Sequence, residues 1–356
     1  LPAIVEWKRA GAMLGEVTLV GTSGPNSQQA EQKVCELSKQ TGVVLNFNVY
    51  PKGDEHDNKT YKKVISTIEK PACAIVVVPD HLHYEVTRDC LEAGLHVLVV
   101  KPLTPTVEEG KKLVNLAKQN GLYAAVEFHK RWDRANLMLR DAIQNDRLGD
   151  LLYGWVEYSQ RKSIPTKVFR AWTEKTSILQ YLGVHYIDIV RFVTKATPIR
   201  VMATGQKNWL HQQGLDAYDS IQCVIEWLMP DGKRFTETIL TNWIDPETSS
   251  SMSDQKIKVV GTKGRFESDQ KERGIRINTD DNNLEQPNPD YCMAYGNSEG
   301  DIEWRGYGIE SVTTFFEDII SINKGNIDIK DLELFRPTFS EALISTAVLE
   351  AAAASL

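Results

Sequence analysis

The sequence predicts an α/β protein in which a doubly wound parallel sheet is followed by a larger, mainly antiparallel open sheet. Two patterns lead to this expectation. Between residues 16 and 128, short apolar runs alternate with helical segments over short connections, as in parallel sheets with right-handed crossovers. From about residue 150, longer segments alternate between apolar and polar residues, as half-exposed strands do. A chain of 356 residues is long enough for two domains with separate cores.

The N-terminal part begins with a predicted helix, because the apolar residues within 1–13 recur at a helical period. A strand follows over residues 16–22 and ends in a Gly-Thr-Ser turn. Residues 27–41 read as a helix that Gly42 terminates. Residues 51–63 are polar and rich in lysine and aspartate, so we expect them to form a surface insertion.

Three further apolar runs predict strands that are buried on both faces. The helix before the third run begins at a capping box, in which Thr106 and Glu109 satisfy each other's backbone N–H groups. The expected strands cover residues 72–78, 95–100 and 122–128, and the expected helices between them cover residues 83–93 and 106–120.

The second half predicts an open antiparallel sheet with helices on one side. Its expected strands cover residues 151–159, 199–206, 220–228, 234–243, 256–260 and 265–268. Its expected helices cover residues 131–145, 178–193, 307–320 and 338–356, and residues 279–300 are expected to form a long loop. We therefore divide the chain into a dinucleotide-binding domain (1–125), a substrate-binding and oligomerisation domain (126–337) and a C-terminal helix that packs back on the body (338–356).

Polar side chains follow the strong N-terminal strands at the point where each strand ends. These side chains are Thr22 and Ser23, then Asp80, His81 and His83, and then Lys101. Open α/β sheets bind ligands at the carboxyl ends of their strands. A lone Lys101 would favour a solvated strand end, but the convergence of polar residues favours a binding site.

The helix expected over 178–193 carries a chemically unusual stripe. Tyr181, His185, Asp188 and Phe192 are spaced by four, three and four residues, so they lie on one side of the helix. A satisfied core histidine would explain His185 without any function. The neighbouring tyrosine and aspartate favour a positioned acid–base group.

Composition narrows the functional classes. The net charge of −7 argues against nucleic acid or an anionic membrane as partner, and no apolar run approaches the roughly 18 residues that span a bilayer. Five scattered cysteines without a C-x-x-C pair suggest neither a disulfide framework nor a metal site. We expect a cytoplasmic protein.

Five segments, in order along the chain, resemble the glucose–fructose oxidoreductase / inositol dehydrogenase / MocA-like (Gfo/Idh/MocA) family of nicotinamide-dependent oxidoreductases. The segments are V-P-D-H-L-H at 78–83, V-K-P-L at 100–103, E-F-H-K-R-W at 127–132, L-G-V-H-Y-I-D at 182–188 and G-T-K-G at 261–264. The resemblance covers nearly the whole chain. It implies an N-terminal Rossmann sheet and oxidation of a hydroxyl group of a sugar, sugar acid or cyclic polyol.

The resemblance also implies roles for individual residues. Lys101 would polarise the reacting hydroxyl, His185 would take its proton, and hydride would pass to NAD or NADP. The implied cofactor-binding residues are Thr22, Ser23, Pro79, Asp80, His83 and Lys101. The residues expected to bind substrate are Arg131, Trp132, Arg170, Trp172 and Asp188. In the family, the uncovered face of the second sheet forms a dimer interface, so the resemblance further implies a homodimer or homotetramer.

The chain departs from the family pattern at four places. Val100 replaces a glutamate before the lysine, and Tyr181 replaces an acidic residue four positions before the histidine. We expect Tyr181 to hydrogen-bond a substrate hydroxyl or to share a proton with Lys101. Gly21-Thr22-Ser23 replaces the acidic residue that binds the ribose in NAD enzymes, which leaves both NAD and NADP open. The chain contains no G-x-G-x-x-G turn, so we expect about 15–20 further residues, a strand and a glycine turn, before Leu1.

Three functions remain open at this point. The first is a sugar or polyol dehydrogenase. The second is an isomerase or lyase that uses a retained NAD transiently through a keto intermediate, and Tyr181 is the feature that suggests it. The third is a catalytically silent binding protein of the same fold, which the changes at Val100 and Tyr181 favour and the presence of Lys101 and His185 opposes.

Overall fold

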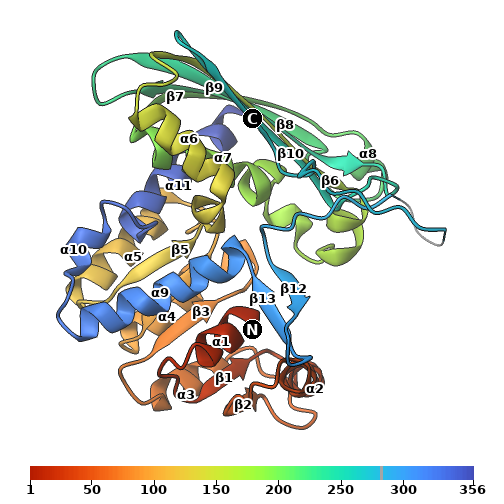
Figure 1. Ribbon diagram of the computed structural model, residues 1–356, viewed down its shortest axis with the longest axis vertical. Coiled ribbons are helices and arrows are strands. Elements are labelled where there is room, and N and C mark those ends of the chain that lie inside the picture. Colours follow the sequence, from red (N-terminus) through yellow and green to blue (C-terminus); the bar gives the residue numbers. More distant parts are fainter. Residues whose placement is uncertain (281–283) are drawn as a thin grey trace.

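The computed structural model describes residues 1–280 and 284–356. A six-stranded sheet from the second half of the chain lies at one end of the molecule, and the N-terminal strands lie at the other (Figure 1). The expected α/β architecture, with parallel strands first and a mainly antiparallel open sheet second, is confirmed. Across the described ranges, no helix has the length and apolar character that a bilayer crossing requires.

The N-terminal strands form two separate parallel sheets. β1 (Val17–Val20) pairs with β2 (Phe47–Tyr50), and the second sheet has the order β3 (Cys73–Val76), β4 (His96–Val100) and β5 (Ala124–Glu127). β4 is central in its sheet and buried along most of its length, which explains its continuous apolar sequence. The helices of this region are α1 (Pro2–Arg9), α2 (Gly24–Thr41), α3 (Thr60–Thr67), α4 (His83–Glu92) and α5 (Val107–Gln119).

The expected helix signals in this region are present. The Thr106 hydroxyl accepts a hydrogen bond from the backbone N–H of Glu109 at 3.3 Å, which caps α5. Gly42 and Gly94 follow α2 and α4 with positive φ angles of 65° and 76°. These caps fix the short connections that bring the strands of each sheet into parallel register.

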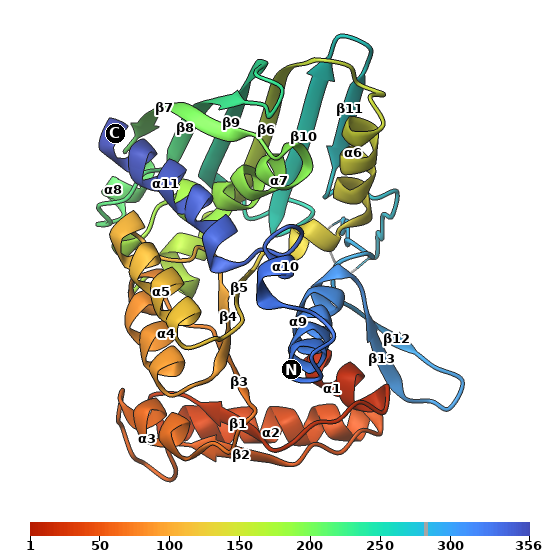
Figure 2. The same cartoon turned by 90° about the vertical axis from the view of Figure 1, so that its left-hand side faces the viewer.

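The second sheet has the order β11-β10-β6-β9-β8-β7, and its single parallel pairing is β6 with β9. Its strands are β6 (Leu151–Arg161), β7 (Thr197–Gln206), β8 (Ser220–Leu228), β9 (Arg234–Asp245), β10 (Ser253–Gly261) and β11 (Arg265–Asp269). Every second residue of β8 is buried, so one face of the sheet packs on the core and the other is half-exposed. The helices α6 (Arg134–Gln144), α7 (Val184–Thr194) and α11 (Phe339–Ser355) cover the buried face (Figure 2).

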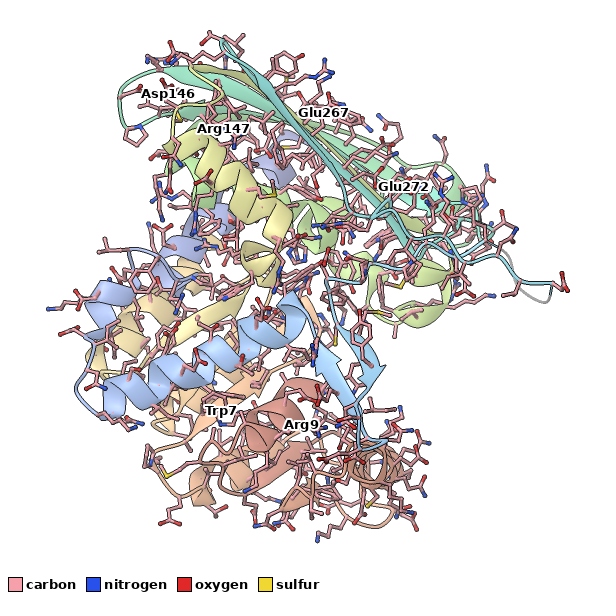
Figure 3. All side chains as sticks on the ribbon, in the orientation of Figure 1. Trp7, Arg9, Asp146, Arg147, Glu267 and Glu272 are labelled. Atoms are coloured by element: carbon pink, nitrogen blue, oxygen red, sulfur yellow. The ribbon has the colours of Figure 1, made fainter. Side chains whose placement is uncertain are left out.

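The C-terminal segment returns to the N-terminal end of the molecule. It contains the hairpin of β12 (Met293–Gly296) and β13 (Ile302–Arg305), followed by α9 (Tyr307–Asn323) and α10 (Ile329–Leu332). The short α8 (Trp209–Gln212) lies between β7 and β8. Arg9 of α1 donates to the carbonyl oxygen of Ile302 at 2.7 Å, and Figure 3 places Arg9 on α1 near the hairpin. α9 also packs on β4 and β5 through Phe315 and Ile319, so these two strands are covered on both faces.

Three expectations about elements are wrong. Residues 47–50 form β2, which the sequence pattern did not predict, and residues 60–67 form α3, so the expected surface insertion at 51–63 runs into a helix. The expected loop at 279–300 contains β12, which pairs with β13. Within that expected loop, residues 281–283 lie outside the described part of the chain. The domain division at residues 125 and 337 stays a prediction.

Candidate active site

Lys101 lies directly after β4, where the parallel sheet meets the second half of the chain. Its Nζ atom donates a hydrogen bond to the carbonyl oxygen of Tyr181 and lies 3.7 Å from the centre of the Tyr181 ring. Burial lowers the pKa of Lys101 to about 8, and the carboxylates of Asp80 and Glu127 oppose this shift. Lys101 is therefore a desolvated ammonium group, and the carbonyl and ring of Tyr181 hold it in place.

The carbonyl of Tyr181 belongs to a wide helical turn with π geometry, η5 (Leu179–Gly183), which leads into α7. Such turns interrupt regular helical hydrogen bonding and are frequent at functional sites. The Tyr181 ring packs among the aromatic rings of Phe169, Trp172 and Trp243, at centroid distances of 4.8, 6.0 and 6.2 Å. Burial raises the pKa of Tyr181, so its phenol stays protonated.

His185 lies in the first turn of α7 and is 3% exposed. Its Nδ1 atom is buried and has no hydrogen-bond partner among the described residues. Burial lowers the pKa of His185 well below its ordinary value, and coulombic interactions with His129, Lys101 and Lys130 lower it further. The imidazole is therefore neutral near pH 7 and able to accept a proton.

Asp80 and His83 form hydrogen bonds that connect the ends of the parallel strands to neighbouring segments. The Asp80 carboxylate accepts hydrogen bonds from the Thr176 hydroxyl, just before η5, at 2.7 Å and from the Gln180 amide, within η5, at 2.9 Å. The two ring nitrogens of His83 lie 2.6 Å from the carbonyl oxygen of Pro102 and 3.0 Å from that of Val78. Asp80 thus ties the parallel sheet to the second domain. His83 is fully buried and ties together the loops that follow β3 and β4.

A glutamate–histidine pair lies beside His185. Glu127 is the last residue of β5, and its Oε2 lies 2.7 Å from Nδ1 of His129 in the next turn, η2 (His129–Trp132). The ring centroids of His129 and His185 are 4.8 Å apart. The His129 ring also packs against Tyr291 and Tyr307. Four titratable side chains, those of Lys101, Glu127, His129 and His185, therefore converge at this edge of the sheet.

Lys130 adds a second buried ammonium group to this region. Its Nζ atom donates hydrogen bonds to the side-chain oxygens of Gln255 and Gln270 and lies over the rings of Tyr158 and Tyr186, 5.4 and 5.6 Å from their centres. Burial lowers the pKa of Lys130 to about 7. Lys130 and Lys101 both act on His185 electrostatically, so the site is positively polarised.

Two residues expected to bind substrate instead bind each other. The Arg131 guanidinium and the Asp188 carboxylate form a bidentate pair with N–O distances of 2.8 and 2.6 Å, and their side chains are 2% and 1% exposed. Both carboxylate oxygens and two guanidinium nitrogens are occupied by this contact. The pair joins η2 to α7 and positions the helix that carries His185.

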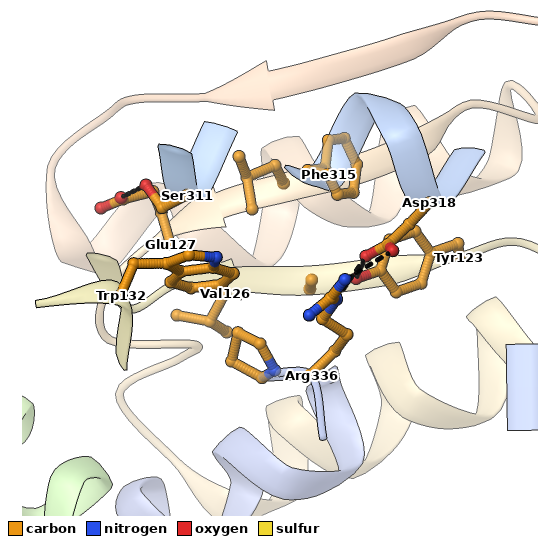
Figure 4. Close-up of a pocket in the computed structure, with 11 residues that line it drawn as sticks. Tyr123, Val126, Glu127, Trp132, Ser311, Phe315, Asp318 and Arg336 are labelled. Carbon is orange, nitrogen blue, oxygen red and sulfur yellow. Dashed lines mark hydrogen bonds and ion pairs between the residues drawn. The ribbon is translucent and has the colours of Figure 1, made fainter. Parts of the chain in front are cut away.

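The other residues expected to bind substrate are spread over the region. Trp172 lies in the aromatic cluster beside Tyr181, as a substrate-stacking residue requires. The Arg170 guanidinium donates to the carbonyl oxygen of Gln213 at 3.3 Å. Trp132 donates to the Thr314 hydroxyl of α9 at 3.1 Å and lines a cavity of about 10 Å³ that also borders Glu127, Ser311 and Arg336 (Figure 4). Of these three residues, Trp172 therefore fits a ligand beside Lys101 best.

Thr22 and Ser23 follow β1, which belongs to the other parallel sheet. Their backbone pairs with the next loop, because the N–H of Asp57 donates to the carbonyl oxygen of Thr22 at 3.1 Å and Ser23 forms a bridge with His56. A Cβ on Gly24 would lie 1.9 Å from the carbonyl oxygen of Gly53, so this glycine is required by the contact between the two loops. These residues are not brought together with Lys101 and His185 in one sheet.

The described residues fit the nicotinamide half of a dinucleotide better than its phosphates. Asp80, Lys101 and Glu127 place polar groups at the carboxyl ends of three adjacent parallel strands, where such ligands bind, and Pro79 borders this edge. The sequence contains no G-x-G-x-x-G turn, so no residue is assigned to the pyrophosphate.

Two models of one protein family match the chain. The first, described as an oxidoreductase family with an NAD-binding Rossmann fold, matches residues 6–128. The second, the GFO/IDH/MocA C-terminal domain, matches residues 136–267. Together they include β1 to β5, Lys101, His185 and most of the second sheet.

Individual proteins with similar sequences are also oxidoreductases that act on polyols or glycosides, as their names state. The scyllo-inositol 2-dehydrogenase (NADP(+)) IolW of Bacillus subtilis is 34% identical over 143 residues, which are 38% of this chain and 39% of that protein. The D-glucoside 3-dehydrogenase of Escherichia coli is 30% identical over 128 residues, 35% of this chain and 36% of that protein. These matches span less than half the length of either relative.

A solved structure supports the fold over nearly the whole chain. It is an inositol dehydrogenase homolog from Azotobacter vinelandii complexed with NADH and myo-inositol. The TM-score is 0.68 at 17% identity, and the match covers 97% of this chain and 96% of that chain.

Proposed function

The chain belongs to the GFO/IDH/MocA oxidoreductase family, and we propose that it transfers a hydride between NAD or NADP and a hydroxyl or keto carbon of a sugar, sugar acid or cyclic polyol. The observation that carries this proposal is the convergence of Lys101 and His185 at the carboxyl edge of the parallel sheet. The names of the relatives support the substrate class, because they act on inositols and glucosides.

In this proposal Lys101 polarises the reacting oxygen. With a pKa of about 8 it is mainly protonated at neutral pH, so its ammonium group can donate a hydrogen bond to the hydroxyl and stabilise negative charge on the oxygen. The contacts with the ring and the carbonyl of Tyr181 orient the ammonium group. Tyr181 therefore supports Lys101 through its backbone and ring face. Its phenol remains proposed as a hydrogen-bond partner of the substrate.

His185 takes the hydroxyl proton, because its imidazole is buried and neutral near pH 7. Trp172 packs beside Tyr181 and offers a ring face to the apolar side of a sugar. When bound, the nicotinamide ring supplies the hydride acceptor, and Pro79, Asp80 and Lys101 are the described residues that would border it. We propose Arg131 and Asp188 as a pair that positions α7, and not as direct substrate ligands.

The test is a substrate screen with purified protein, with the absorbance of NADH and NADPH followed at 340 nm. We expect turnover with at least one cyclic polyol, sugar or sugar acid, and loss of turnover in Lys101→Met. Absence of any absorbance change together with absence of binding of either cofactor would overturn the proposal. Product formation without net change of NAD would identify the retained-cofactor isomerase or lyase instead.

The open face of the second sheet supports a proposal about assembly. A shallow groove of about 470 Å³ lies on this face, and Gln222, Leu240 and Asn242 are among the residues that line it. Met202, on β7, is more than half exposed on this face, where it pairs with Val224 of β8. We propose a homodimer or homotetramer through this sheet, which light scattering on the purified protein would measure. All five cysteines are unpaired, which supports a reducing compartment, and we propose the cytoplasm.

A further inference from the structure

Oxidation at this site releases a proton at a position that has no direct contact with solvent. When a secondary alcohol becomes a ketone, the carbon loses a hydride to the cofactor and the oxygen loses its proton to a base, so each turnover loads one proton onto that base. His185 is the proposed base and is 3% exposed, so bulk water does not reach it freely. Its buried Nδ1 atom lacks a hydrogen-bond partner within the described ranges. A second group must receive the proton before the next turnover.

His129 is placed to be that group. Its ring centroid lies 4.8 Å from that of His185, and the planes of the two rings are inclined by 58°. Its Nδ1 atom is engaged by the Glu127 carboxylate at 2.7 Å, which leaves Nε2 for exchange with another partner. A histidine held by a carboxylate through one nitrogen is oriented to accept or release a proton at the other.

Glu127 extends the same chain of groups away from His185. Its second oxygen accepts a hydrogen bond from the Ser311 hydroxyl at 2.8 Å, and the side chains of Glu127 and His129 are both 16% exposed. The carboxylate also borders the cavity of about 10 Å³ shown in Figure 4, which has about the smallest volume that holds one water molecule. The series from His185 to His129 to Glu127 therefore runs from a closed position to a partly exposed one.

We propose that His129, held by Glu127, carries the substrate proton between His185 and solvent during each turnover. In oxidation, His185 receives the hydroxyl proton, passes it to His129, and regains its neutral form while the proton leaves beside Glu127. Reduction of a ketone runs the same path in reverse. This role rests on the proposed function. His129 is a positioning and proton-carrying residue, since it acts on the substrate only through His185.

The alternative role for His129 is packing. Its ring lies 5.2 Å from that of Tyr291 and 5.8 Å from that of Tyr307, so it also fills space between η2 and α9. Apart from these two phenols, the charged groups around the two histidines are Glu127 on β5, Lys101 after β4 and Lys130 on η2. A packing role predicts lower stability in a variant without a change in how activity depends on pH.

The experiment compares full-length wild type with His129→Gln, Glu127→Gln and the control His211→Gln. His211 is an exposed histidine of α8, so its replacement tests the effect of the substitution type alone. We expect His129→Gln to lower kcat by about tenfold or more with little change in KM, because proton transfer limits turnover when its carrier is lost. The solvent deuterium isotope effect on kcat should increase, and added imidazole should restore part of the rate.

Glu127→Gln keeps a side chain of the same size but removes the carboxylate that engages Nδ1 of His129 at 2.7 Å. We expect it to shift the pH dependence of kcat, whereas His211→Gln should leave it unchanged. The role is overturned if His129→Gln has the wild-type pH profile, isotope effect and insensitivity to imidazole, even if its rate or stability is lower.

A measurement without substrate separates this inference from the proposed function. Histidine side-chain NMR follows the titration of His185 in wild type and in His129→Gln. Because the charge of His129 helps to lower the pKa of His185, the titration of His185 should move to higher pH in the variant. An unchanged titration would overturn the coupling. A shifted titration in a protein that turns over no substrate would contradict the proposed function and leave the coupling supported.

Discussion

The buried pair of Arg131 and Asp188 gives a quantitative prediction, because the structure and the family resemblance assign it different roles. The resemblance implies two substrate ligands, whereas the structure has two side chains that are 2% and 1% exposed and hydrogen-bonded to each other at 2.8 and 2.6 Å. Asp188→Leu removes the negative charge and leaves the Arg131 cation buried without compensation. Arg131→Met removes the positive charge and leaves the Asp188 carboxylate buried without compensation.

The expected magnitude follows from the burial of both partners. Breaking a buried ion pair by removing one partner costs about 3–5 kcal/mol, because the remaining charge keeps its desolvation penalty. Replacing both partners by apolar residues of similar size is often close to neutral. We therefore expect each single variant to lose about 3–5 kcal/mol and Arg131→Met/Asp188→Leu to lose much less than the sum. Burial raises the pKa of Asp188 in spite of Arg131, which is consistent with a large desolvation cost.

Thermal and urea unfolding of the four proteins measure this double-mutant cycle. For a domain of 150–250 residues, 1 kcal/mol corresponds to about 2–4 °C in Tm, so each single variant should lose about 6–20 °C. Lys112→Met is the control, since Lys112 and Glu108 form an exposed pair, and such pairs contribute little to stability. The reasoning is refuted if the single variants unfold within about 1 kcal/mol of wild type, or if their effects add. A raised KM in stable single variants would restore the role of substrate ligands.

Two further predictions concern pH. Lys101 has a pKa of about 8, so kcat should fall as the pH rises above about 8 and the ammonium group loses its proton. Lys101→Arg should lack this decline, because its guanidinium stays charged. A decline of kcat at the same pH in Lys101→Arg would contradict the assignment. Burial raises the pKa of Glu237 from 4.5 to about 8, so between these values unfolding releases a proton and wild type loses stability with rising pH, by up to about 1.4 kcal/mol per pH unit. The stability of Glu237→Gln relative to wild type should therefore increase by a few kcal/mol between pH 5 and pH 8 in urea titrations, and a constant difference would be evidence against the shift.

The sequence alone was sufficient for the strands that follow continuous apolar runs, although Ile75 of β3 is 36% exposed, so the expectation that this strand is buried on both faces is wrong. β3, β4 and β5 follow continuous apolar runs, and the capping box at Thr106 marks the beginning of α5. β8 and β9 alternate strictly between buried and less buried residues, which is the pattern that a sheet with one open face imposes. In these segments local sequence and tertiary environment require the same structure.

Other elements depend on contacts that a short pattern does not contain. β2 is four residues long and gains its order from pairing with β1. β12 and β13 pair across a turn within a stretch rich in proline, asparagine and aspartate, and the hairpin is held to α1 through Arg9. Their apolar signal is too short to outweigh the turn-forming composition around them.

The candidate site was predictable only where its residues carry a local sequence signal. Lys101 is marked by its position at a strand end and His185 by its stripe on one helix, and both are local signals. The pairing of Arg131 with Asp188 joins residues 57 positions apart and could not be read from either segment. Glu127 and His129 carried an unused signal, since residues two apart at the end of a strand point to the same side.

The most direct measurement for the account is hydride transfer in a single turnover, observed by stopped flow with excess enzyme and a substrate from the screen. Lys101→Met should bind cofactor but reduce it at least about 100-fold more slowly than wild type, because it lacks the group that stabilises charge on the reacting oxygen. Lys112→Met should match wild type, since its side chain lies in water on α5. If Lys101→Met reduces the cofactor at the wild-type rate, the hydride-transfer site is not at the end of β4.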